Sequence, residues 1–451
     1  MSVPDSAAAV PRAQWKTRYG FILATLGAAI GIGNIWRFPY VMGENGGGAF
    51  LLVYLGAVLL VGLPMLLGEL AVGRAARREA ASAFAHLGRG RGWRQVGLLG
   101  VVVSFVILTY YSVIAGWAVK YFADFAWLGP VEPGSALAHF QQFTASTFAP
   151  LAWHAMALAL AVAIVAYGVE RGIERASTVL LPALALIVIV LAVHSLTLPG
   201  AWKGIVYLFA PDWSALAHPQ VYLAALGQAF FSLGLAMGIL VTYGSYIPEG
   251  HRLPASAVTI AFGDTFFAVV AAVVIFPAVF SFAIDPEQGP GLAFVVLPAI
   301  FARMTAGQVV GAAFFGLLVV AAVTSMVALI EICVAYVIER FRIGRIRAAA
   351  LVGVGAFLLG VPSSLGFGLW SGVRLFGLPI LDAVDFAASN VLLPLSGLAV
   401  AIFIGWHWRE ADARAAVGIR SKRLAHLWRL SVRYIAPAMI VIVLLRALSV
   451  L

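Results

Sequence analysis

Charged side chains are scarce in this chain: they make up 11% of its 451 residues, against about 25% in a typical soluble domain. Hydrophobic residues make up 63%, and the mean hydropathy is +1.00. A soluble protein has too little polar surface to cover so many apolar side chains, and a disordered chain contains far fewer of them. The composition therefore predicts an all-α integral membrane protein.

Cysteine and catalytic motifs are equally sparse. Cys333 is the only cysteine, so an intramolecular disulfide is excluded and a cysteine metal cluster is disfavoured. The eight histidines lie mostly in predicted loops or near the ends of apolar runs, and no HExxH or GxSxG pattern occurs. An intramembrane enzyme needs a nucleophile–base pair or a metal triad, and we therefore do not expect an enzyme.

Long apolar runs dominate the chain instead. A bilayer core about 30 Å thick needs about 20 apolar residues per helix. Runs bounded by charge, glycine and proline predict eleven transmembrane helices at about 20–41, 49–73, 95–123, 151–168, 176–197, 220–246, 255–284, 307–338, 347–362, 379–406 and 432–451. Basic residues precede the first run, and we find no small-residue cleavage site with it. We therefore interpret the run as a span and not as a signal peptide.

The distribution of Lys and Arg predicts the orientation of these spans. With the N-terminus in the cytoplasm, 23 of the 29 Lys and Arg residues fall on the inner side, which is a strong positive-inside bias. An odd number of spans then places the C-terminus outside. The bias explains the net charge of +10 without a nucleic acid partner, and it indicates a multi-pass protein of the cell inner (plasma) membrane.

Two runs carry small residues near their middle. The first contains residues 27–34 (Gly-Ala-Ala-Ile-Gly-Ile-Gly-Asn), and the sixth contains residues 231–238 (Phe-Ser-Leu-Gly-Leu-Ala-Met-Gly). One explanation is close helix packing, which glycine permits. The other is that both helices break, because unwound backbone is tolerated at this depth where it lines a site. Corresponding breaks five spans apart indicate an inverted repeat with a binding site at the midplane.

Isolated polar side chains lie within the same apolar runs: Asn34, Asp264, Thr324 and Ser325. An ionisable group such as Asp264 is costly there and usually functional; the alternative is a helix-end carboxylate near an inner loop. The alternative for Thr324 and Ser325 is a hydroxyl bonded to its own helix. Oxygen ligands without nitrogen or sulfur suit a hard cation, and Na⁺ is the one expected for a transporter.

Several longer motifs resemble those of the neurotransmitter:sodium symporter family. They are residues 15–18 (WKTR), 31–40 (GIGNIWRFPY), 44–50 (ENGGGAF), 62–64 (GLP), Glu69, 73–74 (GR), Tyr110-Tyr111, 228–232 (QAFFS), Thr242-Tyr243, Ser245-Tyr246 and Thr324-Ser325. The resemblance runs from Trp15 to the eleventh apolar run. The pattern is similar to that of the bacterial amino-acid members of the family.

The resemblance implies a leucine-transporter-type fold, which is a 5+5 inverted repeat with helices 1 and 6 broken. A single transmembrane transporter domain, residues 1–451, would contain repeat one at about 15–200, repeat two at about 218–406 and an extra helix at about 432–451. The sequence lacks a twelfth span, which longer relatives use for contacts, and we expect a monomer or a weak dimer.

The family also implies two Na⁺ sites. The first would use the carbonyl of Ala29 and the side chains of Asn34, Ser232 and Asp264. The second would use the carbonyls of Gly27, Ile30 and Ala321 and the hydroxyls of Thr324 and Ser325. The second set joins spans 1 and 8, so the ion would connect the moving part of the protein to its scaffold.

The resemblance further indicates the substrate. Monoamine carriers of the family have an aspartate where this chain has Gly31, and an amino acid brings its own carboxylate instead. The implied substrate-binding residues are Ala28, Ala29, Gly31, Gly33, Ile107, Tyr111, Phe231, Ser232, Gly234, Met237, Ser325 and Leu329. None carries a charge, which favours a hydrophobic amino acid. For Ile107 and Leu329 ordinary core packing remains the alternative.

Chloride dependence is the property on which this sequence departs from part of the family. Chloride-dependent members resemble it at Tyr54, Gln228 and Ser232, but they have a serine at the position of Ala268 and an asparagine at the position of Asp264. A fixed carboxylate supplies the negative charge that chloride supplies elsewhere. We therefore expect chloride-independent transport.

Gates are implied at both ends of the pathway. Outside, Arg37 and Asp385 would form an ion pair; inside, Arg12 and Trp15 would close against Glu339, with Tyr246 adding a hydroxyl. Ordinary juxtamembrane charge is the alternative, and Trp15 at the expected spacing weighs against it. In span 5, Gly172 and Pro182 match a family motif for unwinding on the inner side.

Taken together, these patterns predict Na⁺-coupled symport of hydrophobic L-amino acids by alternating access. The alternative is a non-transporting membrane amino-acid sensor or a channel of the same fold. The apparent gates favour a carrier, and electrogenic, saturable uptake would separate the two.

Overall fold

The computed structural model describes residues 13–132, 134–248, 250–282 and 293–447. Within these ranges the chain is a bundle of helices with one two-stranded hairpin, β1 (Arg374–Leu375) and β2 (Leu378–Pro379). In this part of the chain nine helical segments are long and apolar enough to cross a membrane, and a bent pair of helices forms a tenth. These features agree with the predicted multi-pass helical membrane protein.

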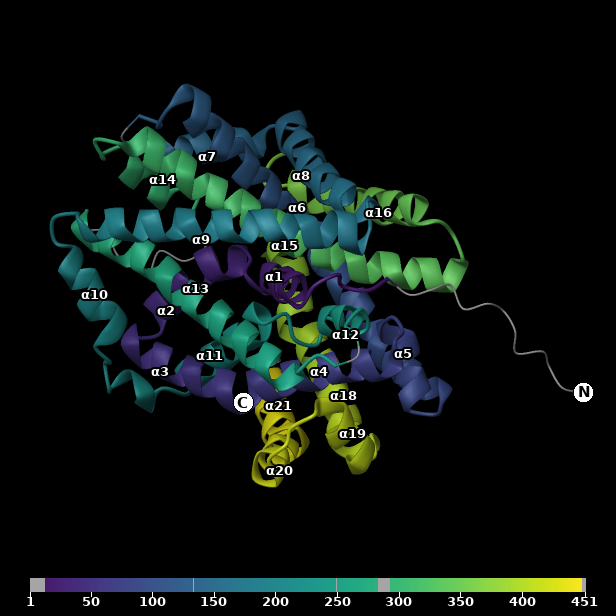
Figure 1. Cartoon of the computed structure of the whole chain (residues 1–451). Coiled ribbons are helices and arrows are strands. Elements are labelled where there is room, and N and C mark those ends of the chain that lie inside the picture. Colours follow the sequence, from purple (N-terminus) through teal and green to yellow (C-terminus); the bar gives the residue numbers. More distant parts are fainter. Residues whose placement is uncertain (1–12, 133, 249, 283–292, 448–451) are drawn as a thin grey trace, which may run out of the picture.

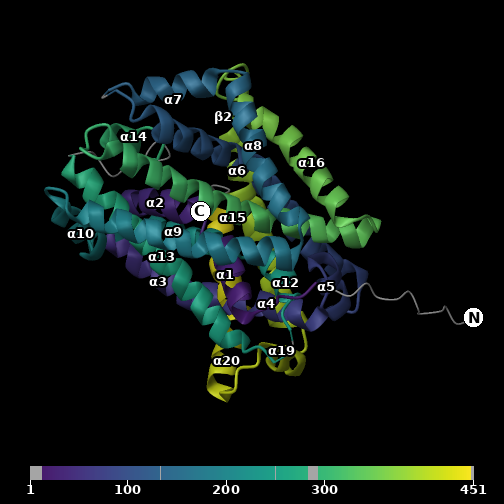
Figure 2. The ribbon, with the colours of Figure 1, turned by 45° about the horizontal axis from the view of Figure 1, so that its top comes forward.

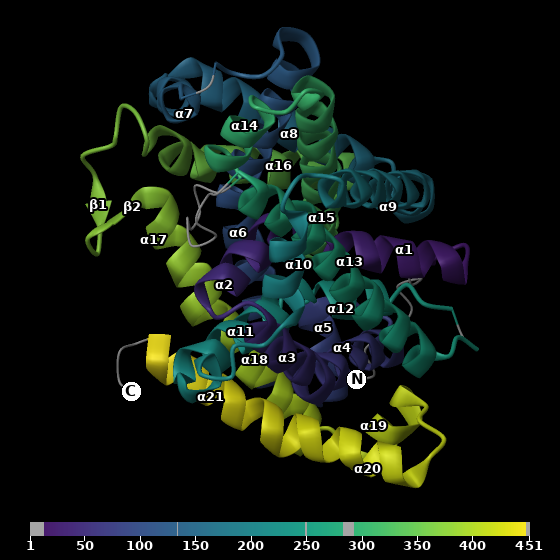
Figure 3. The same ribbon diagram turned by 90° about the vertical axis from the view of Figure 1, so that its left-hand side faces the viewer.

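Figure 1 labels the helices that make up these ten segments, except α17, which Figure 3 labels. They are α1 (Arg18–Ala29) with α2 (Phe38–Glu44), α3 (Gly48–Ala57) with α4 (Leu63–Ala76), α6 (Arg94–Ala123), α8 (Phe148–Ala166), α9 (Arg175–Leu196), α13 (Leu253–Ser281), α15 (Gly307–Phe341), α16 (Arg345–Leu365), α17 (Ile380–Phe386) with α18 (Leu393–Ile402), and α20 (Lys422–Leu430) with α21 (Ala436–Ala447).

The predicted sixth span does not appear as a single long helix. Residues 220–246 are divided into α11 (Pro219–Ser232) and α12 (Ile239–Gly244), and the six residues between them are not helical. The first predicted span is also interrupted: α1 ends at Ala29, a new helical turn begins at Gly33, and the two parts are bent by 54°. Both predicted interruptions are therefore present.

Short helices account for most of the remaining chain. They are α5 (Ala80–Leu87), α7 (Ala136–Ala145), α10 (Ala201–Phe209), α14 (Val296–Phe301) and α19 (Glu410–Val417). The apolar-run analysis treated these segments as loops because each is too short to cross a bilayer. The last predicted span, 432–451, begins earlier than expected, at Lys422, and residues 448–451 lie outside the described part of the chain.

α15 occupies the centre of the bundle and packs against α6, α8, α9 and α16 (Figure 2). The most apolar stretch of α15 is 89% buried, as expected for a helix that is hydrophobic all round and surrounded by others. The pair α20 and α21 has 22% of its most apolar stretch buried and runs along one edge of the molecule (Figure 3). α1 and α12, which belong to the two broken spans, both contact this central helix.

Candidate binding site between the broken helices

Asn34, Ser232 and Asp264 form a buried cluster where the two broken helices meet α13. Asn34 Nδ2 lies 2.9 Å from Ser232 Oγ and 2.7 Å from Asp264 Oδ1, and Ser232 Oγ donates to Asp264 Oδ2 at 2.7 Å. The N–H of Gly31 donates to Asn34 Oδ1 at 3.2 Å. All three side chains are at most 1% exposed. A carboxylate, an amide oxygen and a hydroxyl that lie together in a buried position are ligands that suit a hard cation.

This cluster depends on the two helix ends. The last carbonyls of α1 have no partner further along their own helix, because α1 ends at Ala29. α11 ends at Ser232, and the carbonyls of its last turn accept hydrogen bonds from the N–H groups of residues 233–235 just beyond it. Gln228 connects the two breaks, since its Nε2 donates to the carbonyl oxygen of Gly33 at 3.2 Å. The interrupted backbones therefore supply polar groups that continuous helices would have satisfied internally.

A second oxygen-rich cluster joins the end of α1 to α15. Ser325 Oγ lies 3.4 Å from the carbonyl oxygens of both Gly27 and Ala28. A Cβ on Gly27 would lie 3.2 Å from Thr324 Cβ, so the side chain of Thr324 packs closely against the backbone of Gly27. Thr324 Oγ1 donates to the carbonyls of Val320 and Ala321 at 3.0 Å. Thr324 is therefore bonded to its own helix, which was the alternative to a role as a cation ligand. This bond uses the hydroxyl hydrogen and leaves the lone pairs of the oxygen available to a cation.

A small cavity lies between the two breaks. Its free volume is about 30 Å³, enough for a water molecule, so the walls must separate to admit a larger solute. The lining residues are Ala28, Ala29, Gly31, Gly33, Asn34, Ile107, Tyr111, Phe231, Ser232, Gly234, Met237, Ile239, Ser325 and Leu329. Every residue named from the sequence as substrate-binding is in this set, and none of the fourteen is charged. Ile239, the first residue of α12, was missed because no motif points to it.

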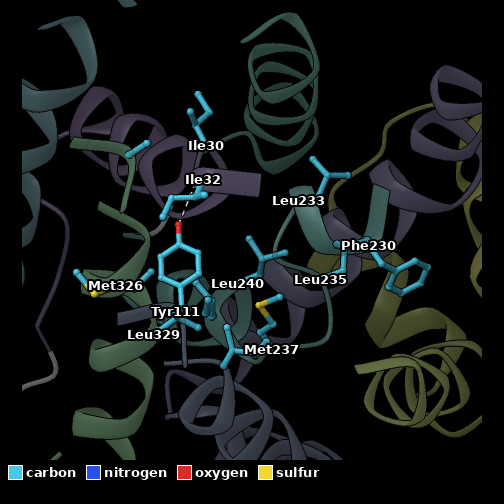
Figure 4. Close-up of a cluster of buried hydrophobic side chains, with 14 of the residues drawn as sticks. Ile30, Ile32, Tyr111, Phe230, Leu233, Leu235, Met237, Leu240, Met326 and Leu329 are labelled. Atoms are coloured by element: carbon cyan, nitrogen blue, oxygen red, sulfur yellow. Dashed lines mark hydrogen bonds between the residues drawn. The ribbon is translucent and has the colours of Figure 1, made fainter. Parts of the chain in front are cut away.

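Tyr111 forms one wall of the cavity and holds the first break in place. Its hydroxyl accepts a hydrogen bond from the N–H of Ile32 at 3.0 Å, and Figure 4 shows the ring between Ile32, Leu329 and Met237. Glycine is required close by: a Cβ on Gly33 would lie 2.7 Å from the Phe231 ring. The backbone of the first break thus touches the aromatic side chains that enclose the cavity.

Tyr54 Oη, Gln228 Oε1 and Thr265 Oγ1 are among the buried polar atoms that have no hydrogen-bond partner in the described part of the chain. The charge of Asp264 acts on Tyr54, so this group of atoms adjoins the Asn34 cluster. The family resemblance points to Tyr54 and Gln228, but it does not point to Thr265, which follows Asp264 in the sequence. Ala268, one helical turn beyond Asp264, is fully buried and brings no hydroxyl to this place.

Arg37 lies against Phe231, a residue of the cavity wall. The guanidinium carbon of Arg37 lies 4.7 Å from the centroid of the Phe231 ring, which is a cation–π geometry. The charge of Asp385 acts on Arg37, while Asp385 Oδ1 accepts a hydrogen bond from Ser389 Oγ at 2.9 Å. Of the two residues expected at an outer gate, Arg37 thus lies over the ring of Phe231 and interacts electrostatically with Asp385.

Trp15 packs against the end of α12. It is 2% exposed, its Nε1 donates to the carbonyl of Tyr243 at 3.0 Å, and its N–H donates to the carbonyl of Tyr246 at 3.0 Å. Its ring meets Tyr243 edge-on at 5.1 Å. Trp15 therefore ties the segment before α1 to the end of α12.

Glu331 and Arg345 lie near the same end of α12 and were missed by the sequence analysis. The hydroxyl of Tyr246 donates to Glu331 Oε1 at 2.6 Å, Arg345 forms an ion pair with the other carboxylate oxygen, and Arg345 Nε donates to the carbonyl of Val165 at 2.8 Å. Glu331 is fully buried, so it needs this partner. The available signal was an acidic residue inside the apolar run 307–338.

Of the two other residues predicted for the inner gate, Arg12 and Glu339, the structure describes only Glu339. Arg12 lies outside the described residues. Glu339 Oε2 accepts a hydrogen bond from the N–H of Glu79 at 3.4 Å. Burial raises the pKa of Glu79 above its ordinary value, and the charge of Glu339 adds to this rise, while N–H bonds from Ser82 and Ala81 oppose it.

Glu174 fastens the start of α1 to the segment that leads into α9. Its carboxylate accepts hydrogen bonds from the N–H of Lys16 at 2.8 Å, the N–H of Thr17 at 3.1 Å and the hydroxyl of Thr17 at 2.7 Å. Gly20 leaves room for this contact, because a Cβ there would lie 2.0 Å from Glu174 Oε1. A negative group at a helix N-terminus also interacts favourably with the helix dipole.

Comparison with known proteins decides the family. The sequence profile of the sodium:neurotransmitter symporter family matches residues 12–127 and 141–451. The chain belongs to this family. It is 49% identical to MhsT, whose crystal structure in complex with L-phenylalanine superimposes with a TM-score of 0.91 over 97% of this chain and 100% of MhsT.

Two further relatives are described as uncharacterised sodium-dependent transporters. The first is YhdH of Bacillus subtilis (strain 168), 38% identical over 97% of this chain and 98% of its own length. The second is a protein of Haemophilus influenzae, 34% identical over 96% of this chain and 97% of its own length. Membership of the family confirms that the chain is a sodium-dependent membrane transporter and not an enzyme.

Proposed function

We propose that this symporter couples Na⁺ entry to the uptake of hydrophobic L-amino acids by alternating access. The observation that carries the proposal is the cavity between the two broken helices: it is lined by uncharged side chains and adjoins two clusters of oxygen donors. The bound L-phenylalanine in the structure of MhsT, at 49% identity, supports an amino acid with an apolar side chain.

Two Na⁺ ions are proposed. The first would bind at Asn34, Ser232 and Asp264 with the carbonyl of Ala29; the hydrogen bonds of 2.7–2.9 Å among these side chains support a shared site. The second would bind between α1 and α15, at the carbonyls of Gly27, Ile30 and Ala321 and the hydroxyls of Thr324 and Ser325. An ion there would hold α1 against α15.

The substrate would lie with each of its charges against a helix break. Its carboxylate would meet the first Na⁺, the N–H groups of residues 31–33 and the hydroxyl of Tyr111. Its ammonium group would meet the carbonyls at the ends of α1 and α11 and the hydroxyl of Ser325. Helix N-termini favour negative groups and helix C-termini favour positive ones, so both charges of a zwitterion find a partner.

Chloride independence is proposed on the basis of Asp264. Its carboxylate is buried within the first cluster, so a fixed negative charge compensates the cations that bind there. Ala268 supplies no hydroxyl with which a chloride ion could be bound.

Alternating access requires barriers at both ends. We propose that Arg37 and Asp385 close the outer end above Phe231, and that Trp15, Tyr246 and Glu339, with Arg12, close the inner end. The contacts of Glu331 with Tyr246 and with Arg345 support a larger inner barrier than the sequence indicated. Ion pairs of modest solvation suit this role because they form and break at little cost.

The arrangement in the membrane is part of the same proposal. It comprises eleven spans, with α11 and α12 together as the sixth, arranged as two inverted repeats at about 15–200 and 218–406 and a final span that begins at Lys422. The N-terminus would lie in the cytoplasm and the C-terminus outside the inner membrane, as the positive-inside bias indicates. The protein would act as a monomer or a weak dimer.

Uptake by purified protein in proteoliposomes tests this function. A panel of labelled amino acids would be offered while Na⁺, K⁺ and Cl⁻ are varied separately. We expect saturable, electrogenic uptake of Leu, Ile, Val, Met and Phe that requires Na⁺ and persists without Cl⁻. Na⁺-dependent binding without transport would identify a sensor, and uptake that does not saturate would identify a channel.

A further inference from the structure

The six-residue segment Leu233–Gly238, between α11 and α12, adopts a conformation that its sequence does not favour throughout. Gly234, Ala236 and Gly238 have left-handed φ angles of +63°, +63° and +72°. Glycine adopts such angles freely, but for alanine they bring Cβ close to its own backbone and are disfavoured. Ala236 must therefore be held in this conformation by contacts from outside the segment.

Three side chains from three other helices make those contacts. The N–H of Ala236 donates to Glu69 Oε1 of α4 at 2.7 Å, and its carbonyl accepts from Ser396 Oγ of α18 at 2.6 Å. The carbonyl of Met237 accepts from Ser104 Oγ of α6 at 2.7 Å. Glu69, Ser104 and Ser396 are all fully buried. Both peptide groups of Ala236 are therefore satisfied by side chains and not by a helix.

The backbone of α6 also supports the segment directly. A Cβ on Gly100 would lie 3.1 Å from the nitrogen of Gly238 and 3.2 Å from the carbonyl carbon of Met237. Gly100 and Ser104 are one helical turn apart, so one face of α6 both packs against the segment and donates to it. These contacts of α6 hold the backbone of Met237 in place, and the backbone in turn positions the Met237 side chain.

Met237 is the part of this segment that matters for the substrate. Its side chain lines the cavity, as Gly234 does, whereas Glu69, Ser104 and Ser396 are absent from the lining. Met237, Tyr111 and Leu329 lie in the same cluster of buried side chains in Figure 4, and all three line the cavity. A shift of the backbone at Ala236 would move the Met237 wall and change the space left for a substrate side chain, without touching the Na⁺-binding oxygens.

We propose that Ser104 and Ser396, together with Glu69, are positioning residues that fix the Leu233–Gly238 segment and thereby set which sizes of amino-acid side chain the cavity accepts. This rests on the proposed amino-acid transport. Because each serine contributes one hydroxyl to one carbonyl, replacing it removes a single hydrogen bond and leaves the volume of the core almost unchanged.

The test compares Ser396→Ala and Ser104→Ala with a matched control, Ser195→Ala. Ser195 is also buried and donates to a backbone carbonyl of another helix, that of Val274 at 2.7 Å, but it lies away from the segment. Competition against labelled L-leucine with Val and Trp gives the ratio of their affinities. We expect at least a threefold change in this ratio for both alanine variants and none for Ser195→Ala. Ser396→Thr, which keeps the hydroxyl, should restore the wild-type ratio.

Hydrogen–deuterium exchange supplies a readout that needs no substrate. The amides of residues 233–241 should exchange faster in Ser396→Ala and Ser104→Ala than in the wild type, and Ser195→Ala should leave them unchanged. Unaltered affinity ratios together with unaltered exchange would overturn the proposal, as would an equal effect of Ser195→Ala. A wild-type protein that binds no amino acid would instead refute the proposed function, while the exchange measurement would still decide whether these serines hold the segment.

Discussion

Gly31→Ala is the substitution whose effect follows most directly from the geometry of the site. A Cβ at this position would lie 2.6 Å from Ser325 Oγ and 2.8 Å from the hydroxyl oxygen of Tyr111, closer than real Cβ atoms approach other atoms. To make room, Ser325 must turn away from the carbonyls of Gly27 and Ala28, and Tyr111 must leave the N–H of Ile32. The added methyl group thus disturbs the second oxygen cluster and the cavity wall together.

The expected magnitude comes from measurements on overpacked cores. Inserting a methyl group into a well-packed site costs about 1–3 kcal/mol, which corresponds to a loss of about 5- to 140-fold in affinity. Equilibrium binding of labelled L-phenylalanine at saturating Na⁺, followed by a Na⁺ titration, measures both losses. The matched control is Gly56→Ala in α3, where a Cβ meets nothing within 4 Å. If Gly31→Ala bound both ligands within twofold of the wild type while folding normally, the assignment of this cavity would be refuted.

Three further predictions concern charge and movement. Asp264→Asn removes the fixed negative charge of the first cluster, so uptake should fall at least tenfold, and in the double variant Asp264→Asn with Ala268→Ser, which also supplies a hydroxyl, uptake should recover partly when Cl⁻ is added; uptake by the double variant that is insensitive to Cl⁻ would contradict the chloride argument. Glu174→Gln weakens the hydrogen bonds to Lys16 and Thr17, so a spin label near the start of α1 should report a larger inward-open population in Na⁺-free buffer, and an unchanged distribution would rule out a fastening role. Pro182→Ala restores a hydrogen bond within α9, so efflux of Na⁺ and turnover should slow severalfold while affinity measured from the outer side stays within twofold; wild-type turnover would show that α9 need not unwind.

The interruptions of both broken helices were predictable from the sequence because their cause is local. Residues 27–34 and 231–238 combine glycine with a single polar side chain in the middle of an apolar run, and a polar group at that depth needs a partner. Asn34 and Ser232 provide one for each other and for Asp264. The residues lining the cavity followed from the same two segments together with the family resemblance.

The inner barrier and the support of the second break were not predictable in this way. The pairing of Glu331 with Arg345 and Tyr246 depends on how α15 folds back into α16 and meets the end of α12, and no local pattern encodes that packing. The same is true of Ser104 and Ser396, which look like ordinary serines of apolar helices until the left-handed backbone of Ala236 is seen beside them. Short helices such as α5 were missed because span length was the only criterion applied.

The reciprocal effect of Na⁺ and substrate on each other's binding tests the central claim most directly. If both ligands complete one site between the two helix breaks, Na⁺ must raise the affinity for L-phenylalanine by the same factor by which L-phenylalanine raises the affinity for Na⁺. Measuring the binding of labelled phenylalanine across a Na⁺ titration, and of ²²Na⁺ across a phenylalanine titration, gives the two factors independently. The account predicts equal factors of at least tenfold, lost in Asn34→Ala. Phenylalanine binding of the same affinity in Na⁺ and in K⁺ would contradict it.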